Sequence, residues 1–464
     1  MTFTRRKMLA GMAGLVAVGV VGGGARYWLG RPADATTHDY ELIAAPADIE
    51  LVAGAKTPAW CYGGQAPGVE LRARQGDWLR VRFINHLPEP TTIHWHGIRL
   101  PLNMDGVPYV SQLPVMPGES FDYLFQVHDA GSFWYHPHTT SAGQLGRGLV
   151  GPLIVEEREP SGFRHERTLT LKSWHVDKQG AFTDFSVPRE AARAGTPGVL
   201  STVNGEHAPT LELPAGQVVR LRVINVTNTL TYRLNLSAGE ARIYAVDGHP
   251  VTPRSLGKDY WLGPGMRIDL ALKVPAAGEQ LSLRNGPLRL ATLVSVSTTE
   301  TETETETGPG SDWPAPLPAN PIAEPDLEKA ETLRFNFEWA GTLSADTGRR
   351  GAFTFWQING QAWDINDKTC ADRPIATLKR DGHYIFELRN LSQYQHPVHL
   401  HGMTFKVISS NRKRIDPWFT DTYLLGKNET ARIALVADNP GVWMFHCHVI
   451  DHMETGLMAA IEVV

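Results

Sequence analysis

Four pairs of histidines, each pair separated by one residue, are the groups in this sequence best suited to chemistry. In a β-strand, residues two apart point to the same face, so each pair aims two imidazoles at one place. Neutral imidazole clusters favour copper, zinc or iron. A single pair of this kind is usually structural, but four of them predict a metal site. The pairs are His94-Trp95-His96, His136-Pro137-His138, His399-Leu400-His401 and His446-Cys447-His448.

One pair encloses a cysteine, which predicts a second kind of metal site. Cys447 stands where the matching pair has Pro137, and His396 and His452 are further histidines in the same part of the chain. Two histidines and one thiolate form the trigonal ligand set of a blue-copper electron-transfer site. An electron entering at Cys447 can pass through the backbone to either neighbouring histidine. One blue copper and a three-copper cluster together hold the four electrons that reduce dioxygen to water.

The elements that position these groups come from a repeat. A turn followed by an alternating strand that ends in Asn occurs three times, at spacings of 140 and 165 residues: Gly76–Asn85, Gly216–Asn225 and Asp381–Asn390. Period-two patterns between Gly, Pro and Asn turns are typical of β-sandwich domains. His-x-His pairs lie nine and eleven residues after the Asn in the first and third copies, where the second has Leu234 and Leu236. If the first and third units pack face to face, eight imidazoles converge.

Composition agrees with a large, turn-rich globular protein. The chain has 464 residues, 44 Gly, 32 Pro, 18 His and a formal net charge of −5. This charge gives no reason to expect nucleic acid or an anionic membrane as a partner. We expect a twin-arginine export signal over residues 1–35, followed by units at 36–160, 161–296 and 326–464, with an exposed Thr-, Glu- and Pro-rich linker at 297–325.

The export signal rests on Arg5 and Arg6, a Gly-rich uncharged run and a small-residue cleavage motif at Ala33-Asp34-Ala35. A permanent membrane anchor is the alternative. Export predicts a periplasmic or secreted protein, without stable membrane association once the signal is removed. A monomer is the expected oligomeric state.

The sequence resembles the multicopper oxidases, in particular the three-domain laccase-like and copper-efflux-oxidase type of bacteria. The resemblance covers the whole mature chain, and the family's four ligand motifs are complete and in order. It implies an all-β fold of three consecutive cupredoxin-like Greek-key β-sandwich domains. It also implies four coppers per chain: one type 1, one type 2 and two type 3. The partners it implies are a small-molecule reducing substrate and O2.

The resemblance also implies which copper each ligand binds. The type 1 copper takes His396, Cys447 and His452. The type 2 copper takes His94 and His399. The type 3 pair takes His96, His136 and His448 on one copper, and His138, His401 and His446 on the other.

Three positions depart from the family pattern or carry a weaker signal. Bacterial relatives commonly have an axial Met ten residues after the Cys, where this chain has Leu457. Loss of the axial sulfur is expected to raise the type 1 potential, unless Met453 or Met458 takes its place. Asp105 matches a family carboxylate that manages protons, with a turn Asp before Gly as the alternative. A second family carboxylate falls at Met453, so the adjacent Glu454 is the candidate for its role.

The remaining cysteines, Cys61 and Cys370, are compatible with an interdomain disulfide or with two buried thiols. We expect His175, Asp247 and His249 to serve packing and turns. Three functional classes are then open: a laccase-like oxidase of phenols and aromatic amines, a cuprous oxidase that protects the periplasm, and a copper-free scaffold. The intact ligand set opposes the scaffold. A two-domain nitrite reductase is disfavoured because it needs no type 3 histidines. The count of 10 Met, with no Met-rich insert, favours the laccase-like oxidase.

Overall fold

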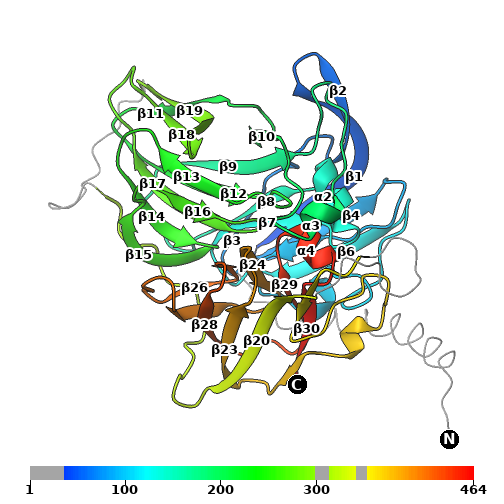
Figure 1. The fold of residues 1–464 in the computed structure, drawn as a ribbon. Helices are drawn as coiled ribbons and strands as arrows, with labels where there is room; N and C mark the ends of the chain where they lie inside the picture. The colour runs from blue at the N-terminus through cyan, green and yellow to red at the C-terminus, as the bar shows by residue number, and fades with distance from the viewer. Residues whose placement is uncertain (1–35, 298–312, 341–352) are drawn as a thin grey trace, which may run out of the picture. The chain divides into compact units, whose positions relative to one another are not determined.

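The computed structural model describes residues 36–297, 313–340 and 353–464 (Figure 1). The predicted export signal and the Thr-Glu stretch lie outside these ranges. Residues from His38 to Val464 form one compact unit. Among the described residues, no helix has the length and apolar character needed to cross a bilayer.

Six sheets make up the described part of the fold, two for each copy of the repeat, and all described helices are short. The first pair has the strand orders β2-β1-β4-β6 and β3-β8-β7-β5. Its strands are β1 (Thr37–Val52), β2 (Ala55–Tyr62), β3 (Leu71–Arg74), β4 (Trp78–Asn85), β5 (His94–His96), β6 (Ser120–Gln126), β7 (Gly131–His136) and β8 (Gly151–Glu156).

The second pair has the orders β10-β9-β12-β17-β14-β15 and β11-β19-β18-β13-β16. Its strands are β9 (His165–Trp174), β10 (Leu200–Val203), β11 (Thr210–Pro214), β12 (Val218–Asn225), β13 (Tyr232–Leu236), β14 (Ala241–Val246), β15 (His249–Ser255), β16 (Tyr260–Leu262), β17 (Arg267–Lys273), β18 (Gln280–Asn285) and β19 (Leu288–Val296).

The third pair has the orders β21-β20-β23-β28-β25-β26 and β22-β30-β29-β24-β27. Its strands are β20 (Glu331–Trp339), β21 (Trp356–Ile358), β22 (Ala376–Leu378), β23 (His383–Asn390), β24 (His396–Leu400), β25 (Phe405–Ser410), β26 (Trp418–Thr420), β27 (Thr422–Leu425), β28 (Thr430–Val436), β29 (Gly441–Cys447) and β30 (Met458–Val463).

Short helical segments connect these strands: η1 (Leu102–Met104), α2 (Ser141–Arg147), α3 (Pro188–Ala191), η2 (Cys370–Asp372) and α4 (Ile450–Glu454). The fold is thus the predicted all-β arrangement of three consecutive sandwiches. The exact domain boundaries stay a prediction.

The Asn that ends each repeated strand has the same structural role in all three copies. The Asn85 side-chain amide donates to Glu89 O and Val115 O, and its oxygen accepts from Leu87 N, at 2.8–2.9 Å. Asn225 and Asn390 repeat this pattern with the matching backbone groups. Each amide therefore satisfies buried backbone groups where the strand turns toward the His-x-His position. This explains why the repeat preserves Asn at that place.

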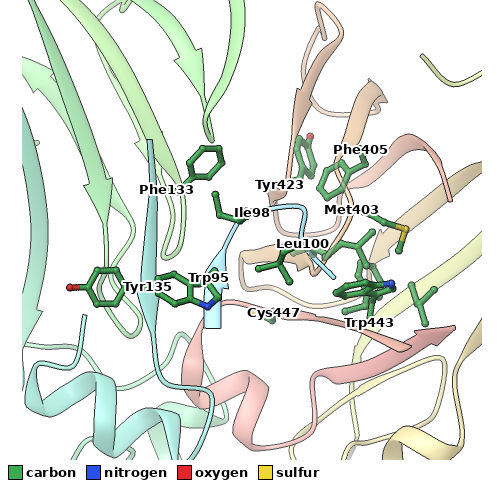
Figure 2. Packing of buried hydrophobic residues seen from close by; sticks show 14 of the residues in the cluster. Trp95, Ile98, Leu100, Phe133, Tyr135, Met403, Phe405, Tyr423, Trp443 and Cys447 are labelled. Atoms are coloured by element: carbon green, nitrogen blue, oxygen red, sulfur yellow. The ribbon is translucent and has the colours of Figure 1, made fainter. Parts of the chain in front are cut away.

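One hydrophobic core joins the first and third units. Trp95, Ile98 and Leu100 from the first belong to the same buried cluster as Trp443 and Cys447 from the third (Figure 2). The middle unit has a core of its own, and there Leu234 packs where the other units carry a histidine. The predicted face-to-face packing of the first and third units is therefore present.

The described part of the predicted linker is held against the sandwiches. Leu317 is buried against Tyr244 and Ala271 of the middle unit. The Asn320 side chain donates to Ala130 O and accepts from Ala130 N, both at 2.9 Å. Seven of the thirteen residues 313–325 are exposed, so the segment is exposed over much of its length and anchored on two units by its apolar and amide side chains.

Candidate metal centre

The four His-x-His pairs meet between the first and third units, as predicted. We call these eight residues the histidine cluster: His94, His96, His136, His138, His399, His401, His446 and His448. Its members sit on or directly after β5, β7, β24 and β29, and none is more than 7% exposed. The strand pairing β5–β7 sets His94 opposite His136, and β24–β29 sets His399 opposite His446.

The cluster is nearly symmetric between its two halves. His94 of the first unit stacks on His401 of the third with ring centroids 3.8 Å apart, and His96 stacks on His399 at the same distance. The ring centroids of His136 and His448 are 5.5 Å apart, as are those of His138 and His446. Each close pair joins one unit to the other.

The outer ring nitrogens of several members are fixed by oxygen atoms of the protein. His136 Nδ1 lies 2.9 Å from Pro137 O, and His446 Nδ1 lies 3.0 Å from Cys447 O. His94 Nδ1 lies 3.0 Å from Asp105 O, and His399 Nδ1 lies 2.9 Å from Asp421 O. An Nδ1–H donor selects the tautomer that leaves Nε2 free to bind a metal.

Those free nitrogens are the test of whether copper fits. Nε2 of six cluster members is buried without a hydrogen-bond partner: His94, His96, His136, His138, His399 and His448. Burial lowers the pKa of His96, His136, His138, His401, His446 and His448 well below the ordinary value. The rings are therefore neutral, and this number of unpaired buried acceptors fits the ligand set of a copper cluster.

The predicted groups of copper ligands differ in how closely their ligand atoms approach one another. The ligand atoms of His138, His401 and His446 lie within 4.8 Å of one another, as do those of His94, His399 and His401. The predicted trio His96, His136 and His448 is not such a group in the described chain, although its ring centroids are 4.8–5.9 Å apart. The assignment of individual ligands to individual coppers stays a prediction.

The cysteine site, which we define as His396, Cys447 and His452, is also assembled. Nδ1 of the two histidines is 3.1 Å apart, and Cys447 Sγ lies 3.6 Å from each. All three side chains are fully buried. Burial raises the pKa of the Cys447 thiol and lowers that of His452 to about 3. A metal cation is what makes the thiolate favourable in such surroundings.

Neither Met453 nor Met458 packs in the hydrophobic cluster that contains Leu457 and Cys447. Leu457 is fully buried in the same cluster as Cys447. Met453 and Met458 pack in a different cluster, with Trp134 of the first unit. Each therefore has its side chain committed elsewhere, and the alternative in which either one supplies the axial sulfur loses its support.

Asp105 reaches the cluster, as predicted. Its Oδ2 accepts from His401 Nδ1 at 2.9 Å, and its Oδ1 lies 3.1 Å from His94 Nδ1. It follows η1 and precedes Gly106, so it serves the turn and the cluster together. Glu454, the last residue of α4, lies against the start of α2, where its Oε1 accepts from Ala142 N at 2.8 Å. Burial raises the pKa of Glu454 to about 7.

Two charged residues beside the cluster carry no signal in the sequence patterns and were not predicted. Asp421, between β26 and β27, has Oδ1 3.4 Å from His399 Nδ1 and 3.7 Å from His96 Nδ1. Arg267 of β17 binds both carboxylate oxygens of Asp421, at 2.6 and 2.8 Å. Burial and the Arg267 charge dominate here, and the guanidinium holds the pKa of Asp421 far below its usual range.

Gly97 leaves room for this buried pair. A Cβ there would lie 2.4 Å from Arg267 Nη2 and 2.5 Å from Asp421 Oδ2. Its φ of +87° also favours glycine. No spacing in the repeat marks Asp421, since it follows its histidine by 22 residues whereas Asp105 follows by 11.

His175, Asp247 and His249 serve packing and turns, as expected. Asp247 in addition contacts Arg267. His175 Nε2 lies 2.9 Å from Thr196 O, and His249 Nδ1 lies 3.2 Å from the Asn320 side chain. Asp247 lies in the β14–β15 turn and also accepts from Arg267 N at 2.6 Å. Cys61 and Cys370 are buried free thiols, so of the two alternatives the structure has no disulfide between them.

Comparison with known proteins gives the family. Models described as multicopper oxidase match residues 44–160 and 345–464. The structure of a multi-copper oxidase from Pseudomonas thermotolerans is 73% identical, covers 93% of this chain and 100% of its own, and superposes with a TM-score of 0.87. This chain belongs to the multicopper oxidase family. It is therefore an oxidoreductase that uses copper and oxygen.

Two more distant relatives span most of the chain. Multicopper oxidase MmcO of Mycobacterium tuberculosis is 29% identical, over 98% of this chain and 92% of its own length. Laccase-2 of Botryotinia fuckeliana is 26% identical, over 92% of this chain and 82% of its own.

Proposed function

We propose that this enzyme is laccase-like: it takes electrons singly from phenolic or aromatic-amine donors and reduces O2 to water with four of them. The observation that carries this proposal is the cysteine site with Leu457 beside it. Without an axial sulfur, the copper at this site is expected to have a high potential, which suits organic donors that are hard to oxidise. The relative named laccase-2 gives further support.

Four coppers fit the donor set, with one at the cysteine site and three in the histidine cluster. Copper supplies a one-electron acceptor at the first place and a site for binding and reducing oxygen at the second. Cys447 and its neighbours in β29 connect the two places, because the thiol faces one site while His446 and His448 face the other. Buried, oriented imidazoles hold both sites in fixed geometry.

Two carboxylates are placed to move protons. Asp105 hydrogen-bonds His401 and lies beside His94, so it can hold a proton at the edge of the cluster. Glu454 has a pKa of about 7 and lies against the start of α2, a helix that begins three residues after His138. Near neutral pH it is therefore able both to give and to take a proton.

The test is oxygen uptake by the copper-loaded protein with 2,6-dimethoxyphenol as donor. We expect one O2 consumed per four donor molecules, no released peroxide, and an intense blue absorption. The alternative is a cuprous oxidase that protects against Cu(I). A preparation with four coppers that oxidises Cu(I) at least about a hundredfold faster than any phenol would favour the alternative and contradict the proposal.

We also propose that the enzyme is exported by the twin-arginine route and acts as a monomer in the periplasm or outside the cell. The basis is the Arg5-Arg6 motif and the cleavage motif at residues 33–35. Replacing both arginines with lysine is expected to retain the full-length precursor inside the cell, as measured by fractionation and by the mass of the chain. Unchanged export would contradict the proposed route.

A further inference from the structure

A segment of the middle unit covers the cysteine site. This cover, which we define as residues 186–198, contains α3 and runs to β10. The His452 Nε2–H donates to Arg193 O at 2.8 Å, and His452 is fully buried. In Figure 1, α3 lies beside α4, which carries His452. The distal nitrogen of this ligand therefore meets a peptide carbonyl of the protein instead of open solvent.

The cover is fixed at several points along its length. Trp356, whose ring centroid lies 4.5 Å from that of His452, donates from Nε1 to Ala191 O at 2.8 Å. Thr196 N donates to Asp451, the neighbour of His452. A Cβ at Gly195 would lie 2.8 Å from both Thr229 Cγ2 and Val449 Cγ1. These contacts leave no space for a donor molecule between the cover and His452.

Arg189 and Arg193 are exposed charges of the cover, and with the half-buried Glu190 between them the cover has a net charge of +1. Within the described residues no ion pair joins either arginine to a carboxylate. The cover contains no Met, Cys or His, so it offers no soft ligand to a cuprous ion. The exposed arginine whose peptide carbonyl meets His452 therefore favours an anionic organic molecule over a bound metal ion.

We propose that reducing substrates dock on the outside of the cover, at Arg193, and that aromatic donors carrying a carboxylate or sulfonate are preferred. This inference rests on the proposed laccase-like function and specifies its donor site. Each donor loses one electron, which crosses the Arg193 peptide and its hydrogen bond to His452. Four donors supply the four electrons that, with four protons, convert one O2 to two waters. No donor group binds His452 directly.

The test reverses the charge at the docking place with Arg193→Glu. Two simple outer-sphere donors of opposite charge are compared, hexacyanoferrate(II) and hexaammineruthenium(II). We expect kcat/KM to fall about tenfold for the anion and to rise severalfold for the cation, and both changes to shrink at high salt. The matched control is Arg289→Glu, an exposed arginine on β19 of the same unit, which is expected to change either value by less than twofold.

A binding measurement keeps this inference separate from the proposed function. Redox-inert hexacyanocobaltate(III) is titrated into the copper-free protein by calorimetry, and Arg193→Glu is expected to weaken its binding about tenfold while Arg289→Glu does not. The blue absorption of loaded Arg193→Glu is expected to be unchanged. Equal effects of the two variants, or a donor preference that does not change, would overturn the docking site. Failure of the wild type to oxidise any organic donor, with intact anion binding, would instead overturn the laccase-like function.

Discussion

The two halves of the histidine cluster are built alike but are supported differently. In the first half, His94 meets the backbone oxygen of Asp105; in the second, His399 meets that of Asp421. Each carboxylate also faces a histidine of the opposite unit, His401 for Asp105 and His96 for Asp421. The difference is that Arg267 neutralises Asp421, whereas no cation pairs with Asp105 among the described residues. The Arg267 charge holds the pKa of Asp421 well below its usual range, so this carboxylate orients its neighbours, and the proton role that we propose is confined to Asp105.

A second difference lies between the paired histidines. Pro137 separates His136 and His138, whereas Cys447 separates His446 and His448. Where the third unit has His396, the first has Thr91, whose Oγ1 donates to Gln144 Oε1 at 2.7 Å. The same strand pair therefore contains an ordinary buried hydrogen bond in one unit and an electron-entry site in the other.

The largest effect is expected for Cys447→Ser, which removes the feature that the first half lacks. Turnover should fall more than about 1,000-fold, equivalent to about 4 kcal/mol, because electrons lose their entry point. The blue absorption should vanish and the copper count should drop from four to three. Cys61→Ser is the control, since Cys61 is a buried free thiol in β2 and is not among the predicted copper ligands. A variant that stays blue would contradict the cysteine site.

Arg267→Met tests the support of the second half. It leaves Asp421 as an unpaired buried charge, so we expect the free energy of unfolding to fall by roughly 3–5 kcal/mol. Arg267→Lys should lose less, because it keeps the charge but not the two-point contact. Denaturant unfolding of the copper-free proteins measures both. If Arg267→Met unfolds like the wild type, the ion pair is not what holds Asp421.

Asp105→Asn tests the proton role of the first half. The amide keeps the size of the side chain but cannot take up a proton, so oxygen reduction should slow roughly 100-fold, about 2.7 kcal/mol in activation free energy. The blue absorption and its reduction by donor should be unchanged. The measurement is stopped-flow reoxidation of the reduced enzyme by O2. Restored activity in Asp105→Glu would support the proton role of Asp105, whereas fast reoxidation of Asp105→Asn would contradict it.

The smallest effect is expected for Thr91→Val, which removes the hydrogen bond in the first half. The cost should be about 1–2 kcal/mol of folding stability, because the buried Gln144 Oε1 loses its donor while Nε2 still donates to Glu89 Oε1 and Pro90 O. Copper content and the blue absorption should stay the same. Loss of blue absorption in this variant would mean that the first unit supports the cysteine site in a way that its contacts do not show.

Sequence patterns predicted the features that depend on strand periodicity. The three strands ending in Asn85, Asn225 and Asn390 are present as β4, β12 and β23, and the His-x-His pairs converge as their register requires. Asp105 was predicted because it matches a carboxylate of the family that the sequence resembles, eleven residues after His94. Asp421, Arg267 and the cover were not, because their contacts join units at long sequence separation, and neither spacing nor composition marks such contacts in one sequence.

The stacked histidines have a consequence for the copper-free protein in acid. His96 and His401 belong to pairs that join the first and third units, and burial lowers their pKa well below the ordinary value. An unfolded histidine takes up a proton near pH 6.5, whereas these stay neutral while folded, so stability is lost as the pH falls below that value. Copper opposes the loss because it binds only the neutral rings in the folded state. The interface between the first and third units is therefore expected to come apart in acid when copper is absent, and to stay closed when copper is bound.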